Sequence, residues 1–307
     1  MPTEAGVLRL SIVVTFGLAT FGVVLGLVTG SAAIIFDGVY TLTDAVMTSF
    51  ALIVAKLISA PSLEDSRFNL SQHFTMGFWH LEPIVLGLSA TLLVGTAGYG
   101  LITAIGTLLN GGREMNFELA LVYSVAAVIG SVGMVIYGKR ANRRLNSNFI
   151  TLDVQAWSIS AAMTGALLVA FLFGWFVAGT ELAWVSPYID SAVLALVCIV
   201  VLPLPLPTIR NALADVLLVT PPSMKKHVDE IASAAVERLG FLGHRSYVAR
   251  VGRSRRIEIY FIVPRSQPAR TLEEWDLIRD EIAEELGAAS PDRWLTIAFT
   301  TDRNWAE

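Results

Sequence analysis

The stretch Gly26–Val46, GLVTGSAAIIFDGVYTLTDAV, decides how this chain is interpreted. It overlaps a mostly apolar segment at 32–59, which exceeds the roughly 20 residues that a helix needs to cross a bilayer. Two carboxylates, Asp37 and Asp44, lie inside that segment. Ionisable side chains within a membrane span are costly and by default mark a pathway or a binding site. The stretch therefore predicts a membrane helix that carries a functional site.

Outward from this stretch, further apolar segments of similar length lie near residues 7–29, 81–109, 118–137, 149–178 and 188–209. Hydrophobic residues make up 54% of the chain and charged residues only 16%, whereas soluble proteins carry about 25% charged residues. The run VLPLPLPTIR at 201–210 contains prolines that interrupt a regular helix, which predicts the exit from the membrane. We therefore expect residues 1–209 to form a six-helix transmembrane domain.

Basic residues gather on one predicted side of the membrane. The loop after 118–137 reads GKRANRRLN, whereas the loop after 81–109 contains only Arg113 and the loop after 149–178 contains neither Lys nor Arg. Cytoplasmic loops carry the excess of Lys and Arg. We therefore expect a multi-pass protein of the cell (inner) membrane with both termini in the cytoplasm.

The segment 210–307 has an ordinary soluble charge density and alternates helix and strand signals in the order αββαβ. Thr271 followed by acidic residues is a typical helix start. We therefore expect a small α+β cytoplasmic domain. The net charge of −4 gives no case for a nucleic-acid partner, and the single cysteine, Cys198, excludes a disulfide scaffold. The chain lacks a phosphate-binding glycine loop, a G-x-S-x-G and an H-E-x-x-H, which argues against an enzyme or an ATP-driven pump.

Helical geometry places the candidate site. Seven residues at about 100° each bring Asp44 within roughly 20° of Asp37 and about 10 Å along the axis, with Tyr40 on the same face. In 149–178, Ser160 likewise follows Asp153 by seven residues. Two acidic helices avoid lipid most simply by facing each other across a polar path, and their oxygens suit a divalent cation or a proton relay. In the alternative interpretation, Asp37 and Asp153 sit near helix ends and reach water or a helix cap.

The stretch at 26–46, with GFWHLEP at 77–83 and DVQAW at 153–157, resembles the cation diffusion facilitator (cation efflux) family over nearly the whole chain. The resemblance implies six helices, both termini inside and a ferredoxin-like cytoplasmic domain. It also implies a homodimer that exports divalent metals such as zinc, manganese, iron, cobalt or cadmium in exchange for protons. The expected partners are therefore the lipid bilayer, a divalent metal ion, protons and a second copy of the chain, with no cofactor.

The family's usual ligands are only partly present. Members place His or Asp four residues before Asp on two helices; here the first pair falls on Tyr40 and Asp44, and the second on Ala156 and Ser160. Positions that hold metal in the cytoplasmic domain of the family fall on Trp275 and Phe299. Near the helix at 81–109, Phe78 stands where many members have His, His80 where Lys or Arg is frequent, and Glu82 keeps the acid.

These departures predict a shifted metal site with Asp44 as central ligand and proton acceptor. Asp153 completes it, Asp37 lies on the outer path, and Tyr40 and Ser160 supply weaker oxygens. An oxygen-rich site favours harder ions such as manganese, magnesium or iron(II) over zinc. Two alternatives stay open: a non-transporting regulatory or heterodimer partner built on an exporter scaffold, and a transporter of a different substrate.

Overall fold

The computed structural model describes residues 4–59, 78–145, 148–252, 254–287, 290 and 292–306. The chain divides into two compact units, Met1–Phe50 with Leu88–Ile209 and Ala51–Gly87 with Arg210–Glu307. Helices dominate the first unit, and a small sheet with its helices dominates the second.

Each apolar segment expected from the sequence is helical, except that a turn at 202–205 interrupts the last one, 188–209. The helices are α1 (Glu4–Thr29), α2 (Ala32–Ser59), α4 (Leu81–Leu109), α5 (Phe117–Leu145), α6 (Asn148–Ala178) and α7 (Ser186–Val201). Within the described residues, five stretches are long and apolar enough to cross a membrane, namely Gly6–Thr29, Leu81–Leu109, Phe117–Leu145, Asp153–Ala178 and Ala183–Val216. The chain is therefore a multi-pass membrane protein. The acid-bearing helix α2 is not among these five, so the count of six spans stays a prediction.

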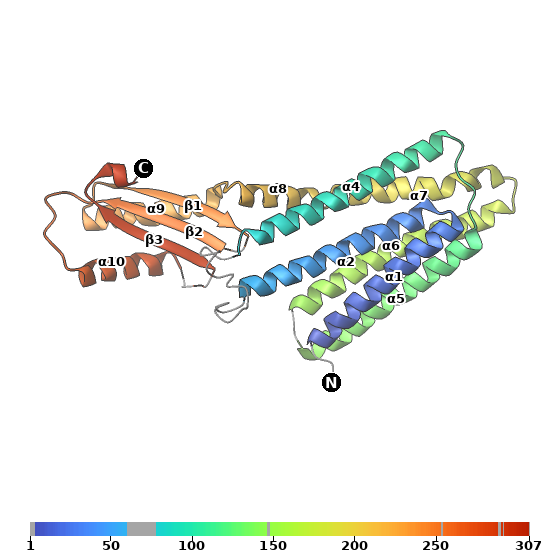
Figure 1. Ribbon diagram of the computed structural model, residues 1–307, viewed down its shortest axis with the longest axis horizontal. Coiled ribbons are helices and arrows are strands. Elements are labelled where there is room, and N and C mark those ends of the chain that lie inside the picture. Colours follow the sequence, from blue (N-terminus) through green and yellow to red (C-terminus); the bar gives the residue numbers. More distant parts are fainter. Residues whose placement is uncertain are drawn as a thin grey trace, which may run out of the picture. The chain divides into compact units, whose positions relative to one another are not determined.

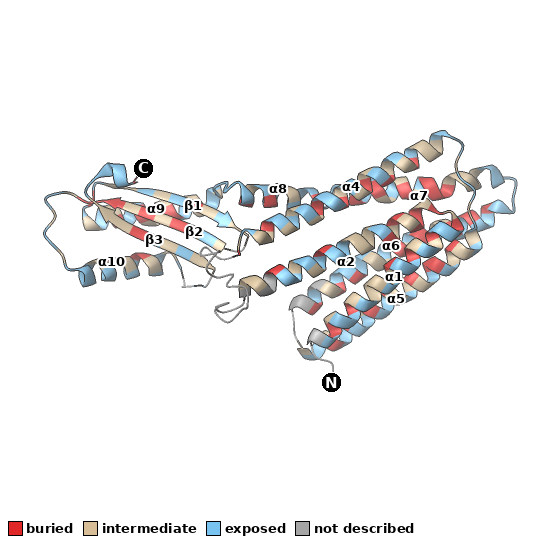
Figure 2. Ribbon diagram, in the orientation of Figure 1, coloured by how far each residue is buried: buried red, intermediate tan, exposed pale blue. Residues whose placement is uncertain are grey.

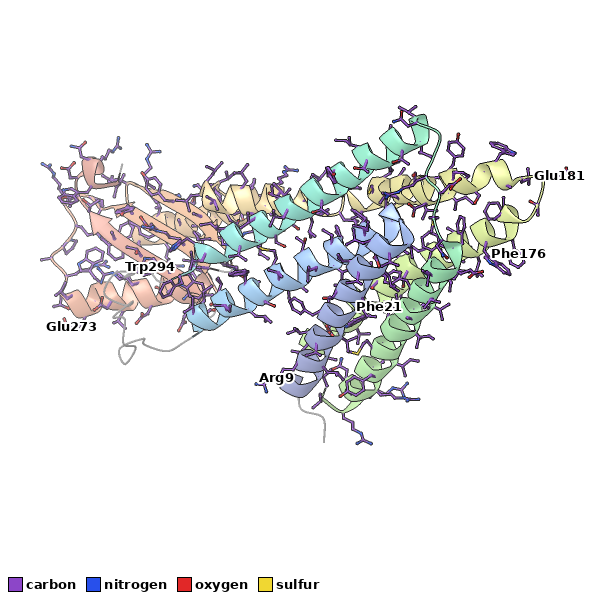
Figure 3. The ribbon with its side chains drawn as sticks, turned by 45° about the vertical axis from the view of Figure 1, so that its right-hand side comes forward. Arg9, Phe21, Phe176, Glu181, Glu273 and Trp294 are labelled. Carbon is purple, nitrogen blue, oxygen red and sulfur yellow. The ribbon has the colours of Figure 1, made fainter. Side chains whose placement is uncertain are left out.

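Helices α1, α5 and α6 lie side by side in the first unit (Figures 1 and 3). Glycine allows α1 and α2 to cross at close range. A Cβ atom added to Gly38 of α2 would lie 2.7 Å from the backbone nitrogen of Val23 and 2.8 Å from the carbonyl oxygen of Ala19. Small residues permit such close backbone approach between membrane helices. Ile34 of α2 and Phe171 of α6 belong to one cluster of buried side chains. Figure 2 shows the buried positions along the helices of this unit in red.

Two boundaries differ from those expected. Helix α5 continues to Leu145, so the basic run expected as a loop forms its last turns; Lys and Arg are good helix formers and are favoured by the dipole at a helix C-terminus. After the prolines, the chain becomes helical again in α8 (Leu206–Val216), which the sequence analysis did not foresee. Pro207 is the second residue of α8, a position where the missing N–H has no intrahelical acceptor to satisfy.

The second unit contains the expected αββαβ order. Its elements after α8 are α9 (Pro222–Leu239), β1 (Gly243–Val251), β2 (Ser254–Ile262), α10 (Leu272–Glu285), β3 (Arg293–Thr300) and the short 3-10 helix η3 (Arg303–Ala306). The sheet order is β1-β2-β3, with β1 and β2 antiparallel and β2 and β3 parallel. Thr271 caps α10 in a capping box with Glu274, as its sequence predicts. The sheet and its helices share one apolar core, which includes Ile259, Phe261 and Ile282.

Candidate functional site

Asp37 is the sixth residue of α2, and its side chain contacts α5. The hydroxyl of Tyr123 donates a hydrogen bond to Asp37 Oδ2 at 2.5 Å, and Tyr123 is only 2% exposed. Beside Asp37 is a cavity of about 10 Å³, lined otherwise by apolar side chains of α2, α6 and α7. A cavity of that size holds about one water molecule. Asp37 is thus a paired carboxylate inside the helix assembly, not a helix cap.

Asp44 and Tyr40 lie one turn apart on α2, where side chains four residues apart are neighbours. Tyr40 is half-buried, and its ring lies 5.6 Å from that of Phe36. Asp44 is exposed on the surface of the protein, and no described residue forms a hydrogen bond or ion pair with its carboxylate. This carboxylate is therefore available to a ligand.

Asp153 on α6 pairs with α1. Ser11 Oγ donates to Asp153 Oδ1 at 2.7 Å and accepts from Trp157 Nε1 at 2.8 Å. Ser11 is 4% exposed, so this hydrogen-bonded chain of three side chains is largely shielded from solvent. The contact orients the half-buried Asp153 carboxylate and joins the helix that carries it to α1.

Ser160 lies opposite α5. Its hydroxyl is 3.3 Å from that of Ser131. No hydrogen bond or ion pair joins any two of the five candidate residues, Asp37, Tyr40, Asp44, Asp153 and Ser160. Within the described ranges, there is no group of three or more His, Cys, Asp or Glu side chains placed to hold a metal. In this helix arrangement, Asp37 and Ser160 make their polar side-chain contacts with α5, and Asp153 makes its contact with α1.

A fourth aspartate of the apolar segments, Asp190, is the fifth residue of α7 and was not among the predicted site residues. It is 1% exposed and accepts hydrogen bonds from Ser31 Oγ at 2.5 Å and from the backbone nitrogens of Ala32 and Ala33 at 2.8 and 3.3 Å. The rule that marks acids within apolar segments would have found it, since Asp190 lies in the expected segment 188–209.

In the second unit, Trp275 and Phe299 pack as a ring pair. Their centroids are 4.5 Å apart, and Phe241 lies 6.3 and 5.9 Å from them. The guanidinium of Arg279 lies 5.3 Å from the centroid of Phe299. The two positions that the family resemblance linked to metal thus contribute aromatic packing to the domain core.

A polar cluster joins α9 to β1 in the same unit. Lys225 Nζ lies 2.5 Å from Asp229 Oδ1 and donates to Ser246 Oγ at 2.7 Å, while His244 Nε2 lies 3.6 Å from Asp229. Partial burial of Asp229 raises its pKa, but hydrogen bonds from Lys225 and Ser246 and the charges of Lys225 and His244 outweigh it, so the pKa is lowered overall. Two groups of the cluster, Asp229 and His244, are ligand types for metals, but Lys225 already holds the carboxylate.

Comparison with known proteins identifies the family. The cation efflux transmembrane domain matches residues 8–217. The chain is 26% identical over 198 residues to the metal cation efflux system protein CzcD of Cupriavidus metallidurans, covering 64% of this chain and 56% of CzcD. It is 24% identical over 170 residues to the cation-efflux pump FieF of Shewanella oneidensis, covering 54% of this chain and 55% of FieF. The chain thus spans little more than half the length of the curated relatives it matches. Because the family's domain covers more than half of its residues, the chain belongs to the cation efflux family, whose members are membrane transporters and not enzymes.

Proposed function

We propose that this chain is a secondary transporter that exports a divalent metal cation from the cytoplasm in exchange for protons. The observation that carries the proposal is Asp44, an exposed carboxylate within the helical unit that has no hydrogen-bond or ion-pair partner among the described residues. A carboxylate in that setting is costly unless it binds a cation or a proton. Family membership and the names of both relatives support a metal cation as the substrate.

Asp44 is the central ligand in this proposal and alternates between metal and proton. Asp153 contributes the second carboxylate when α2 and α6 approach each other, and Ser11 holds its side chain in one orientation until then. Tyr40 and Ser160 add weaker oxygens, and Asp37 with Tyr123 lies on the outer path. Such an all-oxygen ligand set favours manganese, magnesium or iron(II) over zinc.

Residues 1–209 form the transport domain of the proposed exporter, and residues 210–307 form a cytoplasmic domain that joins two copies of the chain. In this proposal both termini are cytoplasmic, because the basic residues at the end of α5 mark the cytoplasmic side, and the membrane is the inner membrane.

A panel of divalent cations tests the proposal with purified protein in liposomes. We expect flux of at least one ion, lost in Asp44→Asn and in Asp153→Asn. Thr43→Ala is the matched control, since the hydroxyl of the neighbouring Thr43 bonds, among the described residues, only to the carbonyl of Val39 in its own helix, at 2.8 Å. Normal flux in Asp44→Asn would rule out the assigned site.

The second candidate function is a non-transporting partner on the same scaffold. It is favoured by Ala156, which replaces a usual ligand, and by Asp37 and Asp153, whose carboxylates are already hydrogen-bonded. It predicts no flux for any ion from the purified chain and co-purification with a ligand-complete family member. Clear flux from the chain alone would exclude it.

A further inference from the structure

The N-terminal end of α2 is held by a carboxylate from another helix. Asp190 Oδ1 accepts from Ser31 Oγ at 2.5 Å and from the nitrogen of Ala33 at 3.3 Å, while Oδ2 accepts from the nitrogen of Ala32 at 2.8 Å. The first backbone N–H groups of a helix lack intrahelical acceptors and attract negative charge. Asp190 therefore satisfies donors that α2 cannot satisfy by itself.

Neighbouring backbone bonds extend this junction. Ser31 Oγ also accepts from the nitrogen of Ile34 at 3.1 Å, which completes the helix cap. The nitrogen of Asn116 donates to the carbonyl of Thr29 at 3.1 Å, and that of Arg113 donates to the carbonyl of Pro187 at 2.8 Å. The α1–α2 turn, the α4–α5 loop and the start of α7 thus form one hydrogen-bonded cluster.

The opposite end of the candidate site is not held in this way. Asp44 lies about 16 Å along the helix axis from Ala33, is exposed, and has no hydrogen-bonded partner among the described residues. Separating Asp190 from α2 would leave a carboxylate that is 1% exposed without its donors, which costs more than the bonds themselves contribute. A shift of α2 is therefore easier at the Asp44 end than at the junction.

We propose that Asp190 is a positioning residue that anchors the N-terminal end of α2, so that helix movement during transport takes place at the half that carries Asp44. The transport part of this inference rests on the proposed function; the anchoring part rests on the junction alone. Loss of the anchor lets α2 shift as a whole. The maximum transport rate then falls, while the metal concentration for half-maximal rate stays the same because no metal ligand has changed.

The test combines hydrogen exchange and transport in Asp190→Asn, because the amide group has one accepting oxygen in place of two and carries no charge. Ser191→Ala is the matched control: this neighbour is also 1% exposed, and its hydroxyl has no hydrogen-bond partner in the described part of the chain. We expect the 32–33 amides to exchange roughly ten- to a hundredfold faster in Asp190→Asn, the factor typical of a lost bond to a charged group. We also expect a lower maximum rate at unchanged half-saturation, with neither change in Ser191→Ala.

Exchange at the wild-type rate in Asp190→Asn would overturn the anchoring role, and wild-type transport in that variant would overturn its link to turnover. If Asp190→Asn does not fold, exchange in the wild-type protein decides, because the first N–H groups of a helix have no intrahelical acceptor. Strong protection of the 32–33 amides then supports the anchor, and exchange at the rate of an amide without a hydrogen bond overturns it. A wild-type protein that moves no metal would refute the proposed function, while the exchange data would still decide whether Asp190 holds α2.

Discussion

The hydrogen bond between Tyr123 and Asp37 gives a prediction whose size follows from the structure. Tyr123→Phe removes only the hydroxyl that donates to Asp37 Oδ2 at 2.5 Å. Hydrogen bonds to charged groups contribute about 1.5–3 kcal/mol in proteins. Between membrane helices the average is lower, about 0.6 kcal/mol with a maximum near 1.7, because the unfolded chain in the membrane also finds partners. Since Tyr123 is 2% exposed and the bond is short, we expect a loss of about 1.5 kcal/mol.

The assay is reversible unfolding in detergent micelles, arranged as a double-mutant cycle of Tyr123→Phe with Asp37→Asn. We expect a coupling free energy of about 1 kcal/mol between the two positions. Tyr99→Phe serves as control, since Tyr99 is 74% exposed and should lose nothing measurable. A coupling below about 0.3 kcal/mol, which is within the usual error of additivity, would refute the view that this pair joins α2 to α5.

Three further predictions concern other parts of the fold. Gly38→Ala should destabilise the protein by about 3 kcal/mol in micelle unfolding, because the added Cβ would meet backbone atoms of α1 at 2.7 Å. The control is Gly98→Ala, where the added Cβ meets open space, and this change should stabilise the protein by up to about 1 kcal/mol. Thr271→Ala should lower the unfolding free energy of the second unit by about 1 kcal/mol in denaturant titration, through loss of the capping box, and an unchanged midpoint would contradict this. The pKa of Asp229 is lower in the folded state than in the unfolded state, so the ionised carboxylate stabilises the fold above its unfolded pKa near 3.9. This stabilisation is lost as the pH falls through the folded pKa. In acid titrations of stability, Asp229→Asn should therefore flatten the loss in this range, and an unaltered slope would contradict the role of Lys225.

The sequence predicts the helices well because their apolar segments are much longer than a β-strand, which excludes strands at these positions. It also predicts the αββαβ order, since strand alternation and the Thr271 cap are local signals. It misses α8 because a proline near the start of a helix is tolerated, and proline was interpreted as a stop. It also places the end of α5 too early, because the basic run was interpreted as a loop.

The candidate site is harder to predict than the helices that carry it. Helical periodicity places Asp37, Tyr40 and Asp44 on one helix, but it does not specify which helix they face. The partner of Asp37 is 86 residues away in the sequence, and that of Asp153 is 142 residues away. Such pairs depend on tertiary packing, which the residue pattern of a single segment does not specify. Asp190 lies in the expected segment 188–209, so the rule for acids within apolar segments is sufficient to mark it.

The proposed exchange of a metal ion for a proton at Asp44 is tested by following both ions at once. Purified protein in liposomes with a pH-sensitive dye in the lumen is given an inward metal gradient. We expect metal entry accompanied by proton exit, with both movements lost in Asp44→Asn and retained in Thr43→Ala. Metal entry without proton movement, or coupled movement that persists in Asp44→Asn, would contradict it.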